Sequence, residues 1–188
     1  MKHLFSICLL AMAWICVNAQ VSYPPIEFDE EGGFSKVVEV KATAKQAFQY
    51  SRAFLSKKIK EYNKAVQVED ADAGKIQVND QMFFKEDAQP QNNDQPTDKR
   101  YIALQEHYKI TIDCKDNKIR VKVENPTYSI TSYLNDHRLL SLPNEKYKYA
   151  TLGMADKEHF FKQRSFSYSR MIDNLVKYIE EQVKEEDF

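Results

Sequence analysis

The stretch that decides the fold is FSKVVEVKATAKQAFQYSRAFLSKKIKEYNKAVQVEDADAGKI, residues 34–76. Its first part, residues 34–41, is short and rich in β-branched side chains, which favours a strand. Thr43 and Gln46 then have the spacing of a capping box, which satisfies the first free amides of a helix. Apolar residues recur at helical spacing as far as Tyr62. We therefore expect an amphipathic helix of about 20 residues after the strand.

Two further strands are predicted after this helix. Residues 65–69 and 75–86 read as strands, and they are separated by an acidic turn that ends at Gly74. The polar residue Asp80 interrupts the second run, which predicts a bulge or a strand end there. Residues 87–99 (DAQPQNNDQPTDK) contain two prolines and no aromatic or branched apolar residue. We expect this segment to be a mobile hairpin loop.

A long alternating run follows at residues 100–114. We expect its apolar side chains to face the core and its charged residues, including Glu106 and Lys109, to face water. Cys114 ends the run on the inward side, where a small core residue is favoured over a reactive thiol. A polar turn then leads to a strand over residues 119–124, so an antiparallel hairpin is expected.

The chain closes with a predicted helix over residues 156–185, because apolar residues recur there at helical spacing. The elements follow the order strand, helix, several strands and helix, without the alternation that builds a parallel sheet. We expect an α+β fold in which a curved antiparallel sheet of about five or more strands carries two long helices on one face. A single domain over residues 34–188 suits this length.

This order and the quoted stretch resemble an exported family of unknown function from Gram-negative bacteria that has a TATA-binding-protein-like fold. The matching features are a strand ending in VEV (residues 38–40), a helix with an aromatic residue near its middle, and an acidic turn closing on GKI (residues 74–76). The resemblance extends from Phe34 to Val123. It implies the order β-α-β-β-β-β-α and export, and it brings no catalytic or binding residue with it.

The N-terminal sequence predicts export. Lys2 precedes an apolar run over residues 4–17, and Ala19 supplies the small residue that signal peptidase requires. We expect residues 1–19 to be a removed signal peptide and residues 20–33, with their prolines, glycines and acidic groups, to be an extended arm. No later segment approaches the roughly 20 apolar residues of a transmembrane helix. The expected location is the periplasm or the cell surface.

The charge balance argues against nucleic acid as a partner. The whole chain has 27 Lys and Arg residues and 28 Asp and Glu residues. Loss of Lys2 with the signal leaves 26 basic residues against 28 acidic ones, a formal net charge of −2. Nucleic-acid-binding domains usually carry a basic excess that neutralises phosphates, so this class of function is disfavoured.

No pattern of catalytic or metal-ligating residues is present in the sequence. His107, His137 and His159 are far apart and lack the close pairing of zinc ligands. The acidic turn at residues 70–74 lacks oxygen ligands that a calcium loop needs. There is no G-x-S-x-G motif and no glycine-rich phosphate loop. We expect no cofactor, no metal site, and a binding protein rather than an enzyme.

Aromatic residues gather in the C-terminal third of the chain, interleaved with basic ones. A tyrosine combines an apolar ring with a polar tip, which suits a surface that binds an envelope protein, a glycan or a small ligand. The alternative is that these rings close the gap between the sheet and the final helix. The candidate interaction surface consists of Tyr128, Tyr133, Lys146, Tyr147, Lys148 and Tyr149.

Three functions remain open from the sequence. The leading hypothesis is an exported, non-catalytic binding or protein-interaction module of the bacterial envelope. The first alternative is a carrier of a small apolar ligand between sheet and helix, in a cavity lined by Phe48, Leu55, Leu104 and Leu175. The second is a hydrolase without a recognisable linear motif, which would need clustered titratable groups in a cleft.

Overall fold

The structure, a computed structural model, describes residues 25–88, 100–134, 139–141, 147–148 and 157–186. The expected signal peptide lies outside the described residues, as does the predicted hairpin loop beyond Ala88. In the stretches that are described, no helix combines the length and the apolarity required to cross a membrane.

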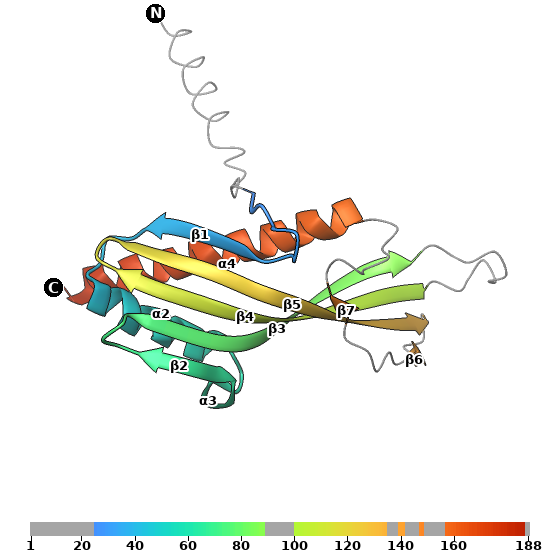
Figure 1. The fold of residues 1–188 in the computed structure, drawn as a ribbon, viewed down its shortest axis with the longest axis horizontal. Helices are drawn as coiled ribbons and strands as arrows, with labels where there is room; N and C mark the ends of the chain where they lie inside the picture. The colour runs from blue at the N-terminus through green and yellow to red at the C-terminus, as the bar shows by residue number, and fades with distance from the viewer. Residues whose placement is uncertain (1–24, 89–99, 135–138, 142–146, 149–156, 187–188) are drawn as a thin grey trace, which may run out of the picture.

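An antiparallel sheet forms the framework of the protein (Figure 1). Its main strands are β1 (Phe34–Glu39), β2 (Val66–Asp70), β3 (Lys75–Ala88), β4 (Arg100–Lys115) and β5 (Lys118–Leu134). Their order across the sheet is β1-β5-β4-β3-β2, and every neighbouring pair is antiparallel. Two short strands, β6 (Leu139–Ser141) and β7 (Tyr147–Lys148), pair with β5 beyond the end of β1. The predicted α+β class and antiparallel sheet are confirmed.

Two long helices, α2 (Ala44–Lys58) and α4 (Lys157–Glu186), pack on one face of this sheet. The predicted capping box is present, since the Gln46 amide donates to Thr43 Oγ1 at 3.3 Å and the Thr43 amide donates to Gln46 Oε1 at 3.0 Å. Helix α2 is shorter than expected because the backbone becomes extended at Ile59. A single turn, α3 (Tyr62–Ala65), then leads into β2.

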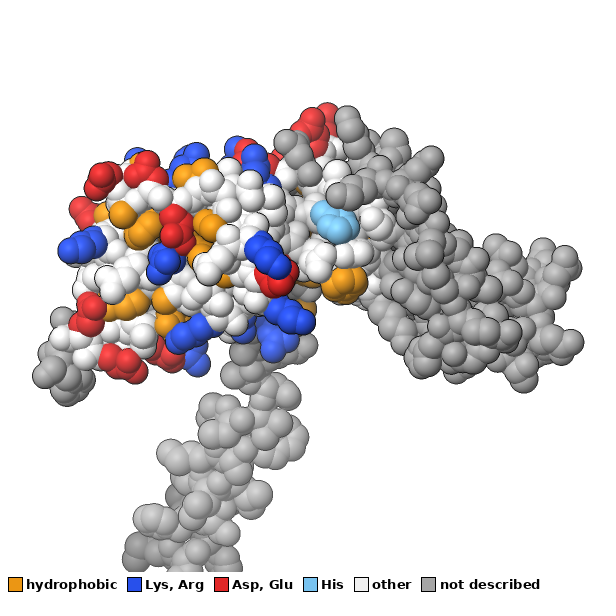
Figure 2. All heavy atoms as spheres, turned by 90° about the horizontal axis from the view of Figure 1, so that it is seen from below, with side chains coloured by type: hydrophobic (Ala, Val, Ile, Leu, Met, Phe, Trp, Pro, Cys, Tyr) orange, Lys and Arg blue, Asp and Glu red, His pale blue; other side chains and the backbone are white. Residues whose placement is uncertain are grey.

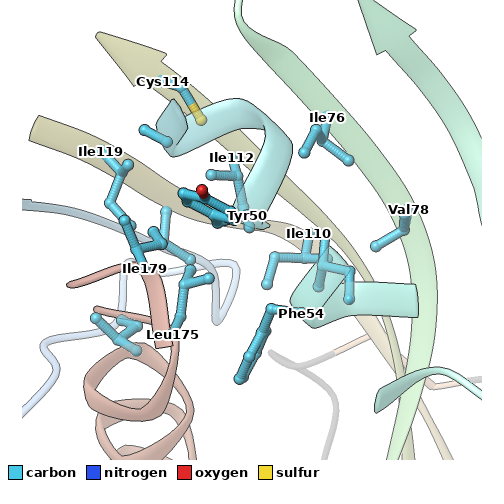
Figure 3. Close-up of a cluster of buried hydrophobic side chains, with 14 of the residues drawn as sticks. Tyr50, Phe54, Ile76, Val78, Ile110, Ile112, Cys114, Ile119, Leu175 and Ile179 are labelled. Atoms are coloured by element: carbon cyan, nitrogen blue, oxygen red, sulfur yellow. The ribbon is translucent and has the colours of Figure 1, made fainter. Parts of the chain in front are cut away.

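The hydrophobic core lies between the helices and the sheet, and Figure 3 shows the side chains of both layers pointing toward one another. Alternate residues of β3, β4 and β5 face the helices, as the alternating pattern predicted. Complete burial of one such aliphatic side chain contributes about 1.5–3 kcal/mol relative to leaving it exposed. The labelled core residues are Tyr50, Phe54, Ile76, Val78, Ile110, Ile112, Cys114, Ile119, Leu175 and Ile179.

The acidic turn between β2 and β3 forms as predicted. The amide of Ala73 donates to the Asp70 carboxylate at 2.9 Å, and Gly74 has φ +63°, a conformation that other residues rarely adopt. The Gly74 carbonyl accepts a hydrogen bond from the Cys114 amide at 2.7 Å. A Cβ atom on Gly74 would lie 2.5 Å from the Cys114 carbonyl oxygen, so the close contact with β4 requires glycine.

The predicted bulge or strand end at Asp80 is wrong. β3 pairs with β4 without a shift from Lys75 to Ala88, and Asp80 lies opposite Tyr108. The Tyr108 hydroxyl donates to the Asp80 carboxylate at 2.9 Å, which gives the polar side chain a partner inside the strand. Register shifts occur instead between β4 and β5, at His107 and Lys109, and between β2 and β3, at Val66 and Val68.

The segment before β1 has no regular secondary structure but packs against the core. Ile26 is buried, and its amide donates to Ser165 Oγ of α4 at 2.7 Å. The Asp29 carboxylate accepts hydrogen bonds from the amides of Glu31 and Gly33, which turns the chain into β1. This segment is therefore held against the C-terminal helix.

Candidate binding surface

The predicted aromatic surface is not exposed at Tyr128. This side chain is fully buried, and its ring contacts Phe160 edge-on with centroids 5.9 Å apart. Its hydroxyl lies 3.5 Å from Glu106 Oε1. At this position the alternative interpretation holds, and the ring fills space between the sheet and α4.

The other predicted surface residues lie in the sheet or outside the description. Tyr133 belongs to β5, and Tyr147 and Lys148 form β7, which pairs with the backbone of Thr127 and Tyr128. Lys146 and Tyr149 lie outside the described residues. For these five residues the interaction surface stays a prediction.

A buried ion pair joins β4 to α4. Arg164 donates from Nε to Glu106 Oε2 at 2.9 Å and from a terminal nitrogen to Glu106 Oε1 at 2.5 Å, and both side chains are 0% exposed. The same terminal nitrogen donates to the Gly32 carbonyl at 2.9 Å. Tyr168 donates its hydroxyl to Glu106 Oε1 at 2.9 Å. This network links the N-terminal segment, the sheet and the C-terminal helix.

Aromatic rings surround the Arg164 guanidinium. Its central carbon lies 4.2 Å from the centroid of Phe28 and 5.7 Å from that of Phe160, which suits cation–π contact. Burial disfavours the charged guanidinium, but the hydrogen bonds and charge of Glu106 outweigh it and raise the pKa of Arg164. Burial, followed by the nearby Glu106 charge, raises the pKa of Tyr168 well above its usual value. Arg164, Glu106 and Tyr168 therefore form a buried network that solvent does not reach.

The sequence analysis placed Glu106 in water, and that prediction is wrong. Glu106 occupies an inward position between Leu104 and Tyr108, so the alternation of the strand was the signal that could have placed it. Its burial is tolerated because Arg164 supplies the opposite charge with paired hydrogen bonds.

Cys114 is a core residue, as predicted. It is buried with a free thiol, and burial raises the pKa of that thiol to about 11. Its Sγ lies 3.9 Å from Ser51 Oγ. A buried thiol with a raised pKa is a poor nucleophile at neutral pH.

The sheet face opposite the helices carries polar and charged side chains. Arg120 pairs with Asp113 at 2.7 Å, and Glu124 pairs with both Lys122 at 2.5 Å and Lys109 at 3.4 Å. On the side of the molecule shown in Figure 2, acidic and basic side chains are mixed, and neither sign gathers into a large patch. Charge alone therefore does not mark a partner on this side.

Two large apolar side chains interrupt the polar sheet face. Phe83 of β3 is 64% exposed and Val37 of β1 is 60% exposed. They lie on strands at opposite sides of the sheet. Burying an exposed aromatic ring against the apolar surface of a partner is favourable, so Phe83 is a candidate contact point.

The outer edge of β3 is only partly covered. β2 pairs with β3 from Lys75 to Val78 and then ends. Among the described residues, no strand pairs with this edge beyond Val78. The edge past Val78 therefore presents backbone donors and acceptors to its surroundings.

Two hollows meet at this edge. The first, which we call the edge groove, has a volume of about 980 Å³. It lies between the end of α2, the α2–α3 connection and α3 on one side and β3 with side chains of β4 and β5 on the other. The second, the helix pocket, has a volume of about 250 Å³ and lies between α2, α4 and the helix side of β3 and β4. Asp80 and Gln81 line both hollows.

The four residues predicted to line a carrier cavity do not come together. Leu55 and Leu175 belong to the main core and Phe48 packs against it, whereas Leu104 lies in a separate buried cluster with Phe84, Tyr128 and Phe160. Of the four, Leu55 alone lines the helix pocket.

Comparisons with known proteins agree with this architecture. No curated protein matches the chain. A TBP-like protein from Parabacteroides distasonis is 21% identical, with a TM-score of 0.53 over 84% of this chain and 96% of its own. A DUF4468 family protein from Bacteroides ovatus is 14% identical, with a TM-score of 0.52 over 82% of this chain and 89% of its own. At these identities the likeness concerns the fold.

A family model described as a domain of unknown function (DUF4468) with TBP-like fold matches residues 34–129. The match begins at the first residue of β1 and ends within β5, so it contains α2 and the main strands of the sheet. The resemblance inferred from residues 34–76 is confirmed. The chain therefore belongs to the DUF4468 family of domains with a TBP-like fold.

Proposed function

We propose that this protein is an exported, non-catalytic module of the bacterial envelope that binds a partner protein. The observation that carries the proposal is the edge groove, which places an exposed ring, Phe83, beside a strand edge that no described strand covers. An exposed aromatic side chain at the rim of a polar groove is the kind of contact that concentrates binding energy in protein interfaces.

The chemistry of the buried groups supports binding rather than catalysis. Arg164 and Tyr168, whose pKa values are raised, satisfy Glu106 inside the core. Cys114 is likewise buried with a raised pKa. Each of these groups already has a structural role within the fold.

Export is supported by the N-terminal sequence. The apolar run over residues 4–17 follows Lys2 and ends in the small residue Ala19, the arrangement of a secretion signal. Removal after Ala19 would leave the whole described fold intact, because that fold begins at Pro25. The proposed location is the periplasm or the cell surface.

A carrier of a small apolar ligand is the second candidate, and the helix pocket favours it. Phe54, Leu55, Met82 and Met171 are among its lining residues, so an apolar ligand would find apolar walls there. A fluorescent fatty-acid analogue tests this function. Saturable binding that Asn174→Trp abolishes at the pocket lining would support a carrier, and binding unchanged by Asn174→Trp would count against it.

The proposed function is tested by capture of partners from bacterial envelope extract with the mature protein. The Phe83→Ser variant should lose the partner that wild type retains, whereas Phe166→Ser on α4, a ring that is 53% exposed, should retain it. A third variant with Tyr133, Tyr147 and Tyr149 changed to Ser tests the C-terminal surface. Failure of the wild-type protein to retain any specific partner would contradict the proposal.

A further inference from the structure

We infer that the edge of β3 beyond Val78 binds an extended segment of a partner protein by strand addition. The inference rests on the proposed function and specifies the partner chemistry. The bound segment would carry a large apolar residue for the helix pocket and acidic residues for the lysines of the edge groove.

The backbone of β3 provides the template. Residues 79–84 are paired with β4 on one side, and in the described part of the chain β2 has already ended on the other. At roughly 3.3 Å per residue, these six residues span about 20 Å, the length of an ordinary strand. An added strand would satisfy the backbone groups that no described strand pairs with, as in other cases of recognition by strand addition.

The helix pocket gives this edge side-chain specificity. Successive side chains of a strand point to opposite faces, and directly opposed residues on neighbouring strands point to the same face. Met82 lies on the helix side and lines the pocket, so a peptide residue opposite it would point into the same space. Its volume of about 250 Å³, lined by Phe54, Leu55 and Met171, suits one large apolar side chain.

The alternate positions of the added strand would face the open side of the sheet. Phe83 points to that side and is 64% exposed, so a peptide residue opposite it would cover part of the ring. The strand would thus be held by apolar contacts on both faces and by backbone hydrogen bonds between them.

The charge of the edge groove favours an acidic segment. Among the described groups that line it, Lys64 pairs with Glu61 at 2.9 Å and Lys109 pairs with Glu124 at 3.4 Å. Lys58 at the end of α2 and Lys60 in the connection that follows are two more lysines of the same groove, and Asp80 of β3 is its third carboxylate. Four lysines against three carboxylates leave the groove with one excess positive charge, which would attract an Asp or Glu side chain of the bound segment.

The test is selection of a phage-displayed library of random decapeptides on the full mature protein. Enriched sequences should show a period of two, with large apolar residues and an excess of Asp and Glu. One selected synthetic peptide is then measured by fluorescence anisotropy, and hydrogen exchange should show protection of amides within residues 79–84 when it binds.

Three variants locate the peptide. Ser167→Trp fills the helix pocket from α4 and should weaken binding roughly tenfold or more, the loss expected when an anchor side chain is displaced. Lys60→Glu should weaken binding by about three- to tenfold, and the affinity of this variant should depend less on salt concentration than that of the wild type. Lys45→Glu, near the start of α2 and so at the far end of that helix from Lys60, should change nothing.

Several results would overturn the inference. These are the absence of enriched peptides, selected peptides that bind Ser167→Trp and Lys60→Glu as tightly as wild type, or protection confined to other strands. Concentration-dependent dimerisation that buries residues 79–84 would show that a second copy occupies the edge, and would also overturn it. Partner capture from envelope extract is a separate measurement, so the proposed function can survive when the peptide inference fails.

Discussion

Replacing Arg164 by Met should destabilise the protein strongly. The Arg164 and Glu106 side chains are both 0% exposed and share paired hydrogen bonds, so the substitution leaves a carboxylate buried without its counter-charge. Breaking one side of a buried ion pair costs about 3–5 kcal/mol. A domain of this size has about 5–15 kcal/mol of stability in total, so the loss should be large.

Urea unfolding of the mature protein, followed by circular dichroism, measures this loss. With a urea dependence of about 2 kcal/mol per molar, the unfolding midpoint should fall by about 2 M. Lys177→Met is the matched control, because Lys177 forms an exposed pair with Glu181 at 3.8 Å and should change stability by less than about 1 kcal/mol.

A double variant separates two causes of the lost stability, the unpaired buried charge and the lost packing of the Arg164 side chain. Glu106→Leu with Arg164→Met removes both charges, which leaves Tyr168 and the Gly32 carbonyl without these partners at a cost of about 1–3 kcal/mol for each group. Each single variant contains an unpaired buried charge, but the double variant contains none. Its loss of stability should therefore be smaller than the sum of the losses of the two single variants. A loss below about 1 kcal/mol for Arg164→Met, or strict additivity in the cycle, would refute this reasoning.

Three further predictions follow from local contacts. Thr43→Ala should lower the free energy of unfolding by about 1 kcal/mol in urea titrations, because it removes the capping box; no loss would contradict it. The Cys114 thiol, with a pKa of about 11, should react with Ellman's reagent at neutral pH only as the protein unfolds; rapid reaction of the native state would contradict its burial. Burial opposes ionisation of Glu69, but hydrogen bonds from Tyr62 and Arg52 outweigh it and lower its pKa. Ionised Glu69 thus adds stability above its unfolded pKa that is lost as pH falls through the lower folded value, so Glu69→Gln should flatten acid unfolding there; an unchanged pH profile would contradict this assignment.

The sequence predicted most of the framework because its signals are local. Alternation over residues 100–114 placed Ile110 and Ile112 in the core, and the spacing of Thr43 and Gln46 marked the start of α2. Such patterns depend on the period of the element and on neighbours a few residues away. The element order and the helix-covered sheet face followed from them.

Glu106 was misplaced because its partner is not local. Arg164 lies 58 residues further along the chain, on another element. A charged residue is rarely buried unless it is paired, so without knowledge of that partner the exposed position was the natural interpretation.

Tyr128 was misplaced because β5 switches from odd-numbered to even-numbered residues facing the core. On β5, Val121 and Val123 point inward, but the register with β4 shifts between Glu124 and Thr127. One extra residue in β5 at this shift moves even-numbered positions to the core side, so Tyr128 faces inward opposite Glu106. The pattern before the shift could not predict the pattern after it.

The sequence also could not predict that the described part of the chain leaves the edge of β3 unpaired beyond Val78. Both strands were predicted, but where β2 stops along β3 depends on their register, which shifts between Val66 and Val68. The register depends on how the two strands pair in the folded protein, and the local sequence pattern does not contain that information.

The most direct test of the binding account is site-specific photo-crosslinking in envelope extract, with benzoylphenylalanine placed at Phe83 in one variant and at Val37 in another. Both positions are exposed and lie at opposite sides of the same sheet, so accessibility to solvent is matched. The account predicts a specific protein adduct at Phe83 and none at Val37. An adduct at Val37 alone, or none at either position, would contradict the assignment of the β3 edge as the binding surface.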